Sequence, residues 1–252
     1  MATRPYVLLS AAMSADGYLD DASSQRLILS DAADLARVDA VRAASDAILV
    51  GGETIRRDNP ALRVRSAAGR EQRLRQGRPA SPARVTLTSA GDFDPAARFF
   101  ADDGIDKLVY TPSAAAGPVR ERLGGMATVV GCGDPLSLPR LLDDLAGRGV
   151  GTLMVEGGAS VLTQFLSAGL ADEFQLAVAP LRVADETAPR LLTGVSDAAA
   201  VGQLSPLDDL GALARPGGAA PGRRLAELRL TEVSRPGRMV VLRYQLTEGI
   251  AG

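Results

Sequence analysis

The sequence contains no histidine and no tryptophan, and its single cysteine is Cys132. Without histidine, a Ser-His-Asp triad, a Cys-His pair and a histidine general base are all impossible. One cysteine excludes a disulfide within the chain, and without histidine it also excludes a Cys/His zinc site. Any chemistry must therefore use carboxylates, arginines, hydroxyls, backbone amides or a bound cofactor. Cys132 lies between two glycines, and we interpret it as a passive small residue.

The chain also lacks long apolar runs and an excess of positive charge. No stretch reaches the ~18 apolar residues of a membrane span. The apolar patch near the amino terminus is interrupted by Asp16 too early for a signal peptide. A net charge of −2 and a pI near 5.4 argue against nucleic acid or a polybasic membrane contact as partners. We therefore expect a cytoplasmic protein with neither nucleic-acid nor membrane partners.

Strand and helix patterns alternate along the chain, as is typical of an α/β fold. The 252 residues, 46% of them hydrophobic, suffice for a sizeable core. The last two expected strands flank a turn at 235–237 and predict an antiparallel hairpin. We find no linker that would divide the chain, so we predict one domain, 1–252. Strands are expected at 6–13, 47–50, 84–88, 107–110, 127–130, 153–155, 174–178, 225–231 and 239–246.

Two polar segments lie between these strands. A helix is expected to begin with Ser30 as its N-cap, because Asp31 and Asp34 follow in the first turn. Arg42 lies at the edge of that helix's apolar stripe and could reach either a cleft or solvent. Segment Ser66–Pro82 is rich in Arg, Gln, Gly and Pro. We predict that it is a mobile surface excursion with solvated basic side chains.

The stretch Gly151–Gly169 has the pattern of an anion site. An apolar run ends at Glu156, two glycines follow, and a helical stripe then runs to Gly169. The glycines allow a ligand to approach the backbone closely, and free N–H groups at the helix start favour a pyrophosphate. Glu156 would lie beside that anion, so it should face something else, such as a donor-rich ring. The alternative is a tight strand-to-helix turn with a solvated glutamate.

A second expected strand also ends in two glycines, at 51–52. Beyond it, Thr54 offers a hydroxyl and Asp58 a carboxylate, and a turn then redirects the chain toward Arg65. Ser89 directly follows the strand at 84–88, where a hydroxyl could bind phosphate. Each of these residues could instead serve only as a turn or cap residue.

Three ordered segments carry a resemblance to a known family: VLLSAAMSADG, DAILVGGETIRRDNPALRVR and LMVEGGASVLTQFLSAGLADEFQLAVAP. Together they resemble the reductase domain of riboflavin biosynthesis, which has a dihydrofolate-reductase-like fold. The resemblance covers nearly the whole chain and implies a mostly parallel central sheet of about nine strands flanked by helices. It also implies a symmetric homodimer that uses NADPH to reduce 5-amino-6-(5-phosphoribosylamino)uracil to the ribitylamino product. In many bacteria a zinc deaminase precedes this domain, but its His/Cys ligands cannot exist here, so we expect the reductase alone.

The resemblance also assigns roles to residues. It places the pyrophosphate against 158–164 and two arginines in the substrate site, where guanidinium groups would suit a phosphate. It assigns no catalytic residue, so the proton could come from Asp16, Asp58, Glu156 or an ordered water. The implied substrate-binding residues are Arg42, Leu62, Arg65 and Glu156. The implied NADPH-binding residues are Met13, Thr54, Asp58, Ser89, Gly157, Gly158, Ala159, Ser160, Val161 and Leu162.

Two departures from the family pattern leave the substrate open. The family often has a basic residue where this chain has Tyr18, and the tryptophan of the following loop is absent. One alternative is a reductase of dihydrofolate or of another pterin or secondary metabolite, because arginines would bind a folate carboxylate as readily as a phosphate. Another alternative is a non-catalytic nucleotide-binding descendant of the fold.

Overall fold

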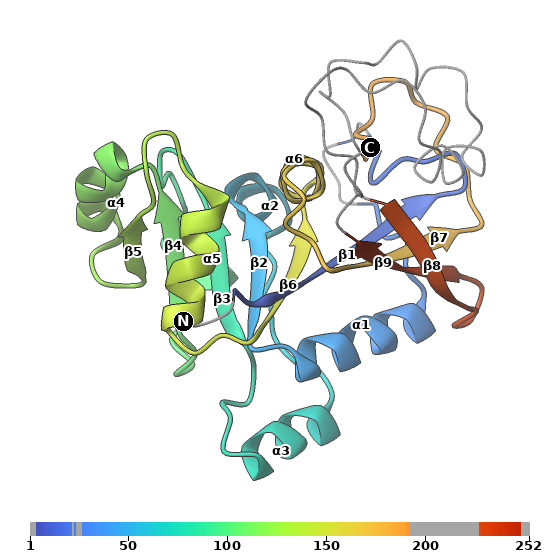
Figure 1. Cartoon of the computed structure of the whole chain (residues 1–252), viewed down its shortest axis with the longest axis horizontal. Coiled ribbons are helices and arrows are strands. Elements are labelled where there is room, and N and C mark those ends of the chain that lie inside the picture. The colour runs from blue at the N-terminus through green and yellow to red at the C-terminus, as the bar shows by residue number, and fades with distance from the viewer. Residues whose placement is uncertain (1–3, 22, 24–26, 192–226, 248–252) are drawn as a thin grey trace. The chain divides into compact units, whose positions relative to one another are not determined.

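The computed structural model describes residues 4–21, 23, 27–191 and 227–247 (Figure 1). The chain divides into two compact units. Met1–Val7 and Ala36–Gly158 form the first, and Leu8–Leu35 and Ala159–Gly252 form the second. Each unit combines separate stretches of chain, so their boundary does not correspond to one cut in the sequence. A single reductase domain covering 1–252 stays a prediction.

The first unit is built on five strands in the order β5-β4-β3-β2-β6, and all neighbouring pairs are parallel. These strands are β2 (Ala47–Gly51), β3 (Ala83–Leu87), β4 (Lys107–Thr111), β5 (Thr128–Gly131) and β6 (Thr152–Gly157). The helices are α2 (Gly52–Asp58), α3 (Ala67–Arg75), α4 (Ala116–Leu123) and α5 (Leu138–Gly147), with short 3-10 turns at Arg98–Phe100 and Ser113–Ala115. Strand thus alternates with helix, as the sequence pattern predicts.

Helices cover both faces of this first group of strands. On one face, Ile48 of β2 packs in a cluster with Ile55 of α2 and Val119 of α4. On the other face lies α5, where the hydroxyl of Tyr110 in β4 donates to the carboxylate of Asp144 at 2.6 Å. Parallel strands covered on both faces read as continuous apolar runs, which explains why β2 is buried at every position.

The second unit contains four strands in the order β1-β7-β9-β8. They are β1 (Tyr6–Ser14), which enters this unit at residue 8, β7 (Glu173–Ala179), β8 (Glu227–Ser234) and β9 (Val240–Thr247). Strand β1 pairs with β7 in parallel, whereas β9 pairs antiparallel with both β7 and β8. The unit also contains α6 (Ala159–Ser167) and the start of α1 (Ala32–Ala44). No helix in the described parts of either unit has the length and apolar character needed to span a membrane.

The predicted fold class is confirmed. The described residues form nine strands, five of the seven strand pairings given above are parallel, and β8 and β9 form the C-terminal antiparallel hairpin. The first two residues of the strand expected at 225–231 lie outside the described residues. The predicted N-cap of α1 was wrong by one residue, because Asp31 rather than Ser30 accepts the N–H of Asp34, at 3.0 Å.

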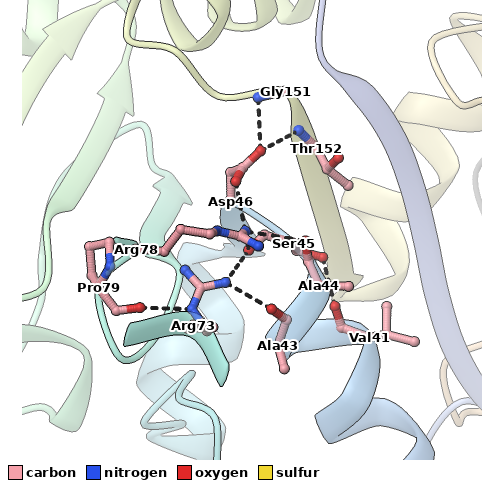
Figure 2. A network of polar contacts seen from close by, with 10 residues as sticks. All are labelled: Val41, Ala43, Ala44, Ser45, Asp46, Arg73, Arg78, Pro79, Gly151 and Thr152. Atoms are coloured by element: carbon pink, nitrogen blue, oxygen red, sulfur yellow. Dashed lines mark hydrogen bonds and ion pairs between the residues drawn. The ribbon is translucent and has the colours of Figure 1, made fainter. Parts of the chain in front are cut away.

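Most of segment Ser66–Pro82 is exposed, but the prediction that its basic side chains are solvated was wrong for Arg73. The segment contains α3, and Arg73 is 2% exposed. Its guanidinium donates to the carbonyls of Ala43 and Ser45, and Arg78 donates to the Ser45 carbonyl and the Asp46 carboxylate (Figure 2). Burial, together with the charge of Arg78, lowers the pKa of Arg73 to about 10. The two arginines therefore satisfy carbonyls at the end of α1, which a helix cannot satisfy by itself.

Candidate functional site

Strand β6 ends in a bulge at Glu156. Val155 and Gly157 pair with consecutive residues of β2, so Glu156 is the extra residue. A bulge redirects the side chain that it carries. Here the carboxylate accepts two hydrogen bonds from the guanidinium of Arg42, from Nε to Oε1 and from Nη2 to Oε2, each 2.6 Å long. This two-pronged geometry is the strongest form of arginine–carboxylate pairing.

The Arg42–Glu156 pair is mostly buried, with side chains 12% and 13% exposed. Burial disfavours the charge on Arg42, but the Glu156 carboxylate outweighs this and raises the pKa of the guanidinium. Neither the solvent-facing Arg42 nor the solvated Glu156 that the sequence left open is observed. Because each charge neutralises the other, Arg42 has little net charge left for a substrate phosphate.

The glycine pair at the end of β6 meets α2 at Gly158. Gly157 has a φ of 114°, which favours glycine, and its peptide bond to Gly158 is cis. A Cβ added at Gly158 would lie 3.2 Å from Oγ1 of Thr54. The two strand-plus-diglycine motifs thus meet at this point, where Gly157 is buried and Gly158 is exposed. This open backbone fits the pyrophosphate of a nicotinamide cofactor.

Helix α6 begins directly after these glycines, at Ala159. In its first turn Ser160 is exposed, whereas Val161 and Leu162 are 7% and 2% exposed. The apolar side chains serve the core, so this turn would offer an anion its backbone N–H groups and the Ser160 hydroxyl.

The other predicted residues of the first unit differ in accessibility. Asp58 is the last residue of α2 and is half-buried, and Ser89 is exposed just beyond β3. The turn carrying Ser89 is held by Thr88, whose hydroxyl accepts the N–H groups of residues 90 and 91. Leu62 is 1% exposed within the core cluster and has a φ of 42°, rare for a residue with a side chain. Leu62 could therefore contact a substrate only through its backbone.

Arg65 presents an exposed side chain on a fixed backbone. Its N–H donates to Oδ1 of Asp39 at 2.5 Å. Within the described residues we find no partner for the Arg65 guanidinium. Sequence reasoning missed Asp39, although one signal was present: it lies three residues before Arg42, on the same side of α1.

Two further predicted residues belong to the second unit. Met13 pairs with Val178 across β1 and β7 and is 6% exposed. Asp16 accepts hydrogen bonds from the Ser14 hydroxyl and from the N–H groups of residues 183 and 184. Burial alone would raise the pKa of Asp16, but these donors lower it. Asp16 is therefore ionised at neutral pH and poorly suited to donate a proton.

The guanidinium of Arg190 stacks on the ring of Tyr18. Tyr18 stands where the family often has a basic residue. The guanidinium carbon of Arg190 lies 4.2 Å from the ring centroid, and Nη2 of Arg190 donates to the Tyr18 hydroxyl at 2.5 Å. Cations over aromatic faces are attracted by the ring quadrupole. Sequence spacing gave no signal for this pair, which joins residues 172 positions apart.

Comparison with known proteins agrees with this fold and identifies a family. Residues 5–208 match the family described as the RibD C-terminal domain. A 2,5-diamino-6-ribosylamino-4(3H)-pyrimidinone 5′-phosphate reductase from Archaeoglobus fulgidus is 35% identical over 193 residues, which are 77% of this chain and 88% of that protein. The riboflavin biosynthesis protein RibD of Bacillus amyloliquefaciens is 32% identical over 75% of this chain, which spans only 49% of its length.

A solved structure shows the same fold. The pyrimidine reductase-like protein from Corynebacterium diphtheriae superposes with a TM-score of 0.74 at 23% identity, covering 97% of this chain and 92% of that one. The sequence relatives, which are named as reductases, set aside the non-catalytic alternative. The chain belongs to the RibD C-terminal domain family, the reductase domain of riboflavin biosynthesis, and is an oxidoreductase.

Proposed function

We propose that this protein uses NADPH to reduce 5-amino-6-(5-phosphoribosylamino)uracil to its ribitylamino product. The observation that supports this most is the buried Arg42–Glu156 pair, two residues before the exposed Gly158 backbone that meets Thr54. A carboxylate only accepts hydrogen bonds, and each Glu156 oxygen keeps a lone pair beyond its bond to Arg42. Glu156 can therefore accept N–H groups from the edge of a pyrimidine ring.

A nicotinamide cofactor, when bound, supplies the hydride for this reduction. In the first unit, Thr54, Asp58, Ser89, Gly157 and Gly158 would hold it. The contacts of Met13 and of residues 159–162 stay predictions from the family resemblance. The chain's own contribution is orientation, because fixing two reacting groups in a productive geometry removes much of the entropic barrier. NADPH rather than NADH is part of the proposal.

The protonating group in the proposed reaction can be narrowed. Its hydrogen-bond donors lower the pKa of Asp16, so Asp16 is poorly suited to give up a proton. Asp58, Glu156 and an ordered water stay candidates to deliver a proton to the substrate nitrogen.

A second pyrimidine substrate is favoured by one specific observation. The Archaeoglobus relative, 35% identical, is named for a diaminopyrimidinone ribosyl phosphate rather than for the aminouracil. The additional ring amino group is a hydrogen-bond donor, which a carboxylate such as Glu156 could accept. Dihydrofolate, which the sequence also left open, presents a carboxylate instead of a phosphate to the arginines.

One experiment separates these substrates. NADPH oxidation would be followed with the aminouracil ribosyl phosphate, the diaminopyrimidinone ribosyl phosphate and dihydrofolate side by side, and repeated with NADH. We expect the highest kcat/KM with NADPH and the aminouracil compound. A higher value with the diamino compound would assign that compound as the substrate, and turnover of dihydrofolate alone would overturn the proposal.

Replacing Gly158 with valine should weaken NADPH binding. The added Cβ would already press on Thr54, and the two methyl groups would fill the pyrophosphate approach. Losing one or two hydrogen bonds to a charged group weakens affinity by about tenfold to a hundredfold. Titration calorimetry would measure the affinity, with Gly117→Val as control, because a Cβ at Gly117 in α4 meets open space. Unchanged NADPH affinity in a folded Gly158→Val protein would show that the pyrophosphate does not bind against Gly158.

We also propose the symmetric homodimer. The sequence predicts that strand 174–178 and the closing hairpin together supply its apolar contact surface. Strand β7 cannot supply much apolar contact area, because Phe174 and Leu176 are each 1% exposed within the single chain. On strand β8, however, Leu230 and Val233 are 49% and 56% exposed. Light scattering should give twice the chain mass of 26.1 kDa. A monomer mass in dilute solution would contradict this assembly.

A further inference from the structure

Asp39 accepts the backbone N–H groups of two consecutive residues, Arg65 and Ser66. Its Oδ1 accepts the N–H of Arg65 at 2.5 Å and its Oδ2 accepts the N–H of Ser66 at 2.9 Å. Asp39 is 6% exposed, so both bonds are shielded from water. Burial alone would raise its pKa, but the two amides and the Ser66 side chain outweigh this and lower it, with a smaller contribution from the charge of Arg42. The carboxylate is therefore ionised and fully engaged at neutral pH.

The segment that follows Arg65 is also hydrogen-bonded to the end of α1 through Arg73 and Arg78. Arg73 and Arg78 donate to carbonyls at and just beyond the end of α1, with distances of 2.6 Å to the Ser45 oxygen from both (Figure 2). Asp46 in turn accepts the N–H groups of residues 151 and 152, at the start of β6. Residues 65–78 are thus held at both ends, and the exposed Arg65 side chain extends from a fixed backbone.

The same helix holds the other predicted substrate residues. Arg42 lies one turn after Asp39, pairs with Glu156, and donates from Nη1 to the carbonyl of Arg63 at 3.3 Å. One acid and one base on α1 therefore set the positions of Glu156 and of the backbone at 63–66. Both oxygens of Asp39 accept backbone N–H groups of this segment, and the Ser66 side chain also hydrogen-bonds to Asp39.

We propose that Asp39 is a positioning residue for Arg65, and through it a determinant of the enzyme's preference for a phosphorylated substrate. This role rests on the proposed function, in which Arg65 binds the substrate phosphate. Asp39 itself touches neither substrate nor cofactor. Small displacements of a binding group weaken catalysis strongly, by up to about a hundredfold for 1 Å.

The test measures kcat/KM for phosphorylated and dephosphorylated ribosylaminopyrimidine and takes their ratio. In Asp39→Asn, an amide NH₂ would face one of the two N–H donors, so one bond is lost and the segment shifts. We expect the ratio to fall about tenfold while kcat/KM for the dephosphorylated compound changes by less than about twofold. In an Arg65→Ala background, Asp39→Asn should leave the ratio unchanged, because the group that it positions is gone.

Two further variants keep the test decisive. Asp39→Glu retains the charge and displaces it by one methylene, so it should lower the ratio even if Asp39→Asn fails to fold. Asp31→Asn is the matched control, since Asp31 also accepts two backbone N–H groups, from Asp34 and Arg238, and should leave the ratio unchanged.

The failures are distinguishable. If Asp39 variants lower kcat/KM for both substrates alike, or act equally in the Arg65→Ala background, Asp39 is only a scaffold residue and the inference is overturned. If Arg65→Ala itself leaves the ratio at its wild-type value, the phosphate contact in the proposed function is wrong, and the role of Asp39 falls with it.

Discussion

Replacing Arg42 with methionine is expected to lower the free energy of unfolding by about 3 to 5 kcal/mol and to reduce reductase kcat/KM more than a hundredfold. The substitution leaves Glu156 as an unpaired charge in a site where its side chain is only 13% exposed. Removing one partner of a buried ion pair costs more stability than replacing both partners, because the remaining charge stays desolvated without a partner. Urea denaturation and the NADPH oxidation assay would measure the two effects.

A double variant separates stability from function at this pair. Arg42→Met combined with Glu156→Leu removes both charges and fills the space with apolar side chains. Such replacements of buried ion pairs are often neutral or stabilising. We therefore expect the double variant to recover most of the stability but none of the activity, because the acceptor for the pyrimidine ring is gone. Single variants within about 1 kcal/mol of the wild type would show instead that the pair behaves as a solvated surface pair.

The strands and the two diglycine turns could be predicted from sequence because their signals are local. Apolar runs of strand length, glycine pairs and helical stripes each depend on neighbouring residues, and the structure places the strands within a few residues of the predictions. The fold class followed from their alternation. The meeting of Gly158 with Thr54 also agrees with two motifs that each ended a buried strand at the same edge.

The polar contacts could not be predicted, because they depend on distant partners. Arg42 and Glu156 are 114 residues apart, and their pairing depends on a β-bulge that the local sequence does not predict. Arg73 sits in a segment whose composition is typical of solvated loops, yet it is buried because α1 ends with carbonyls that need donors. Asp39 could be placed on the same side of α1 as Arg42, but not against the backbone of Arg65.

The structure changes which arginine matters for the phosphate. The sequence suggested that two arginines share it, but Arg42 is neutralised by Glu156, whereas the Arg65 guanidinium is exposed on a backbone held by Asp39. A free guanidinium on a fixed segment is suited to a dianionic group at the far end of a substrate. That end does not react, so its binding energy is used to hold the reacting carbon in place.

Arg65→Ala should therefore lower kcat/KM for the phosphorylated substrate by about tenfold to a hundredfold, since hydrogen bonds to charged groups contribute about 1.5 to 3 kcal/mol each. Both kcat and KM should suffer, because remote binding energy serves orientation as well as affinity. With the dephosphorylated compound, wild type and variant should differ little, as the arginine then has no partner to lose.

The neighbouring Arg63 provides the matched control for Arg65→Ala. Arg63 is also exposed, and only its backbone carbonyl takes part in the site, as the acceptor from Arg42. Arg63→Ala makes the same change in net charge two residues away, so it should leave the preference for the phosphorylated compound intact. Equal losses in the two variants would point to general electrostatic attraction instead of a specific contact. If the wild type preferred the dephosphorylated compound, or if Arg65→Ala impaired both compounds alike, the phosphate contact would be wrong and a pterin-like substrate would be favoured.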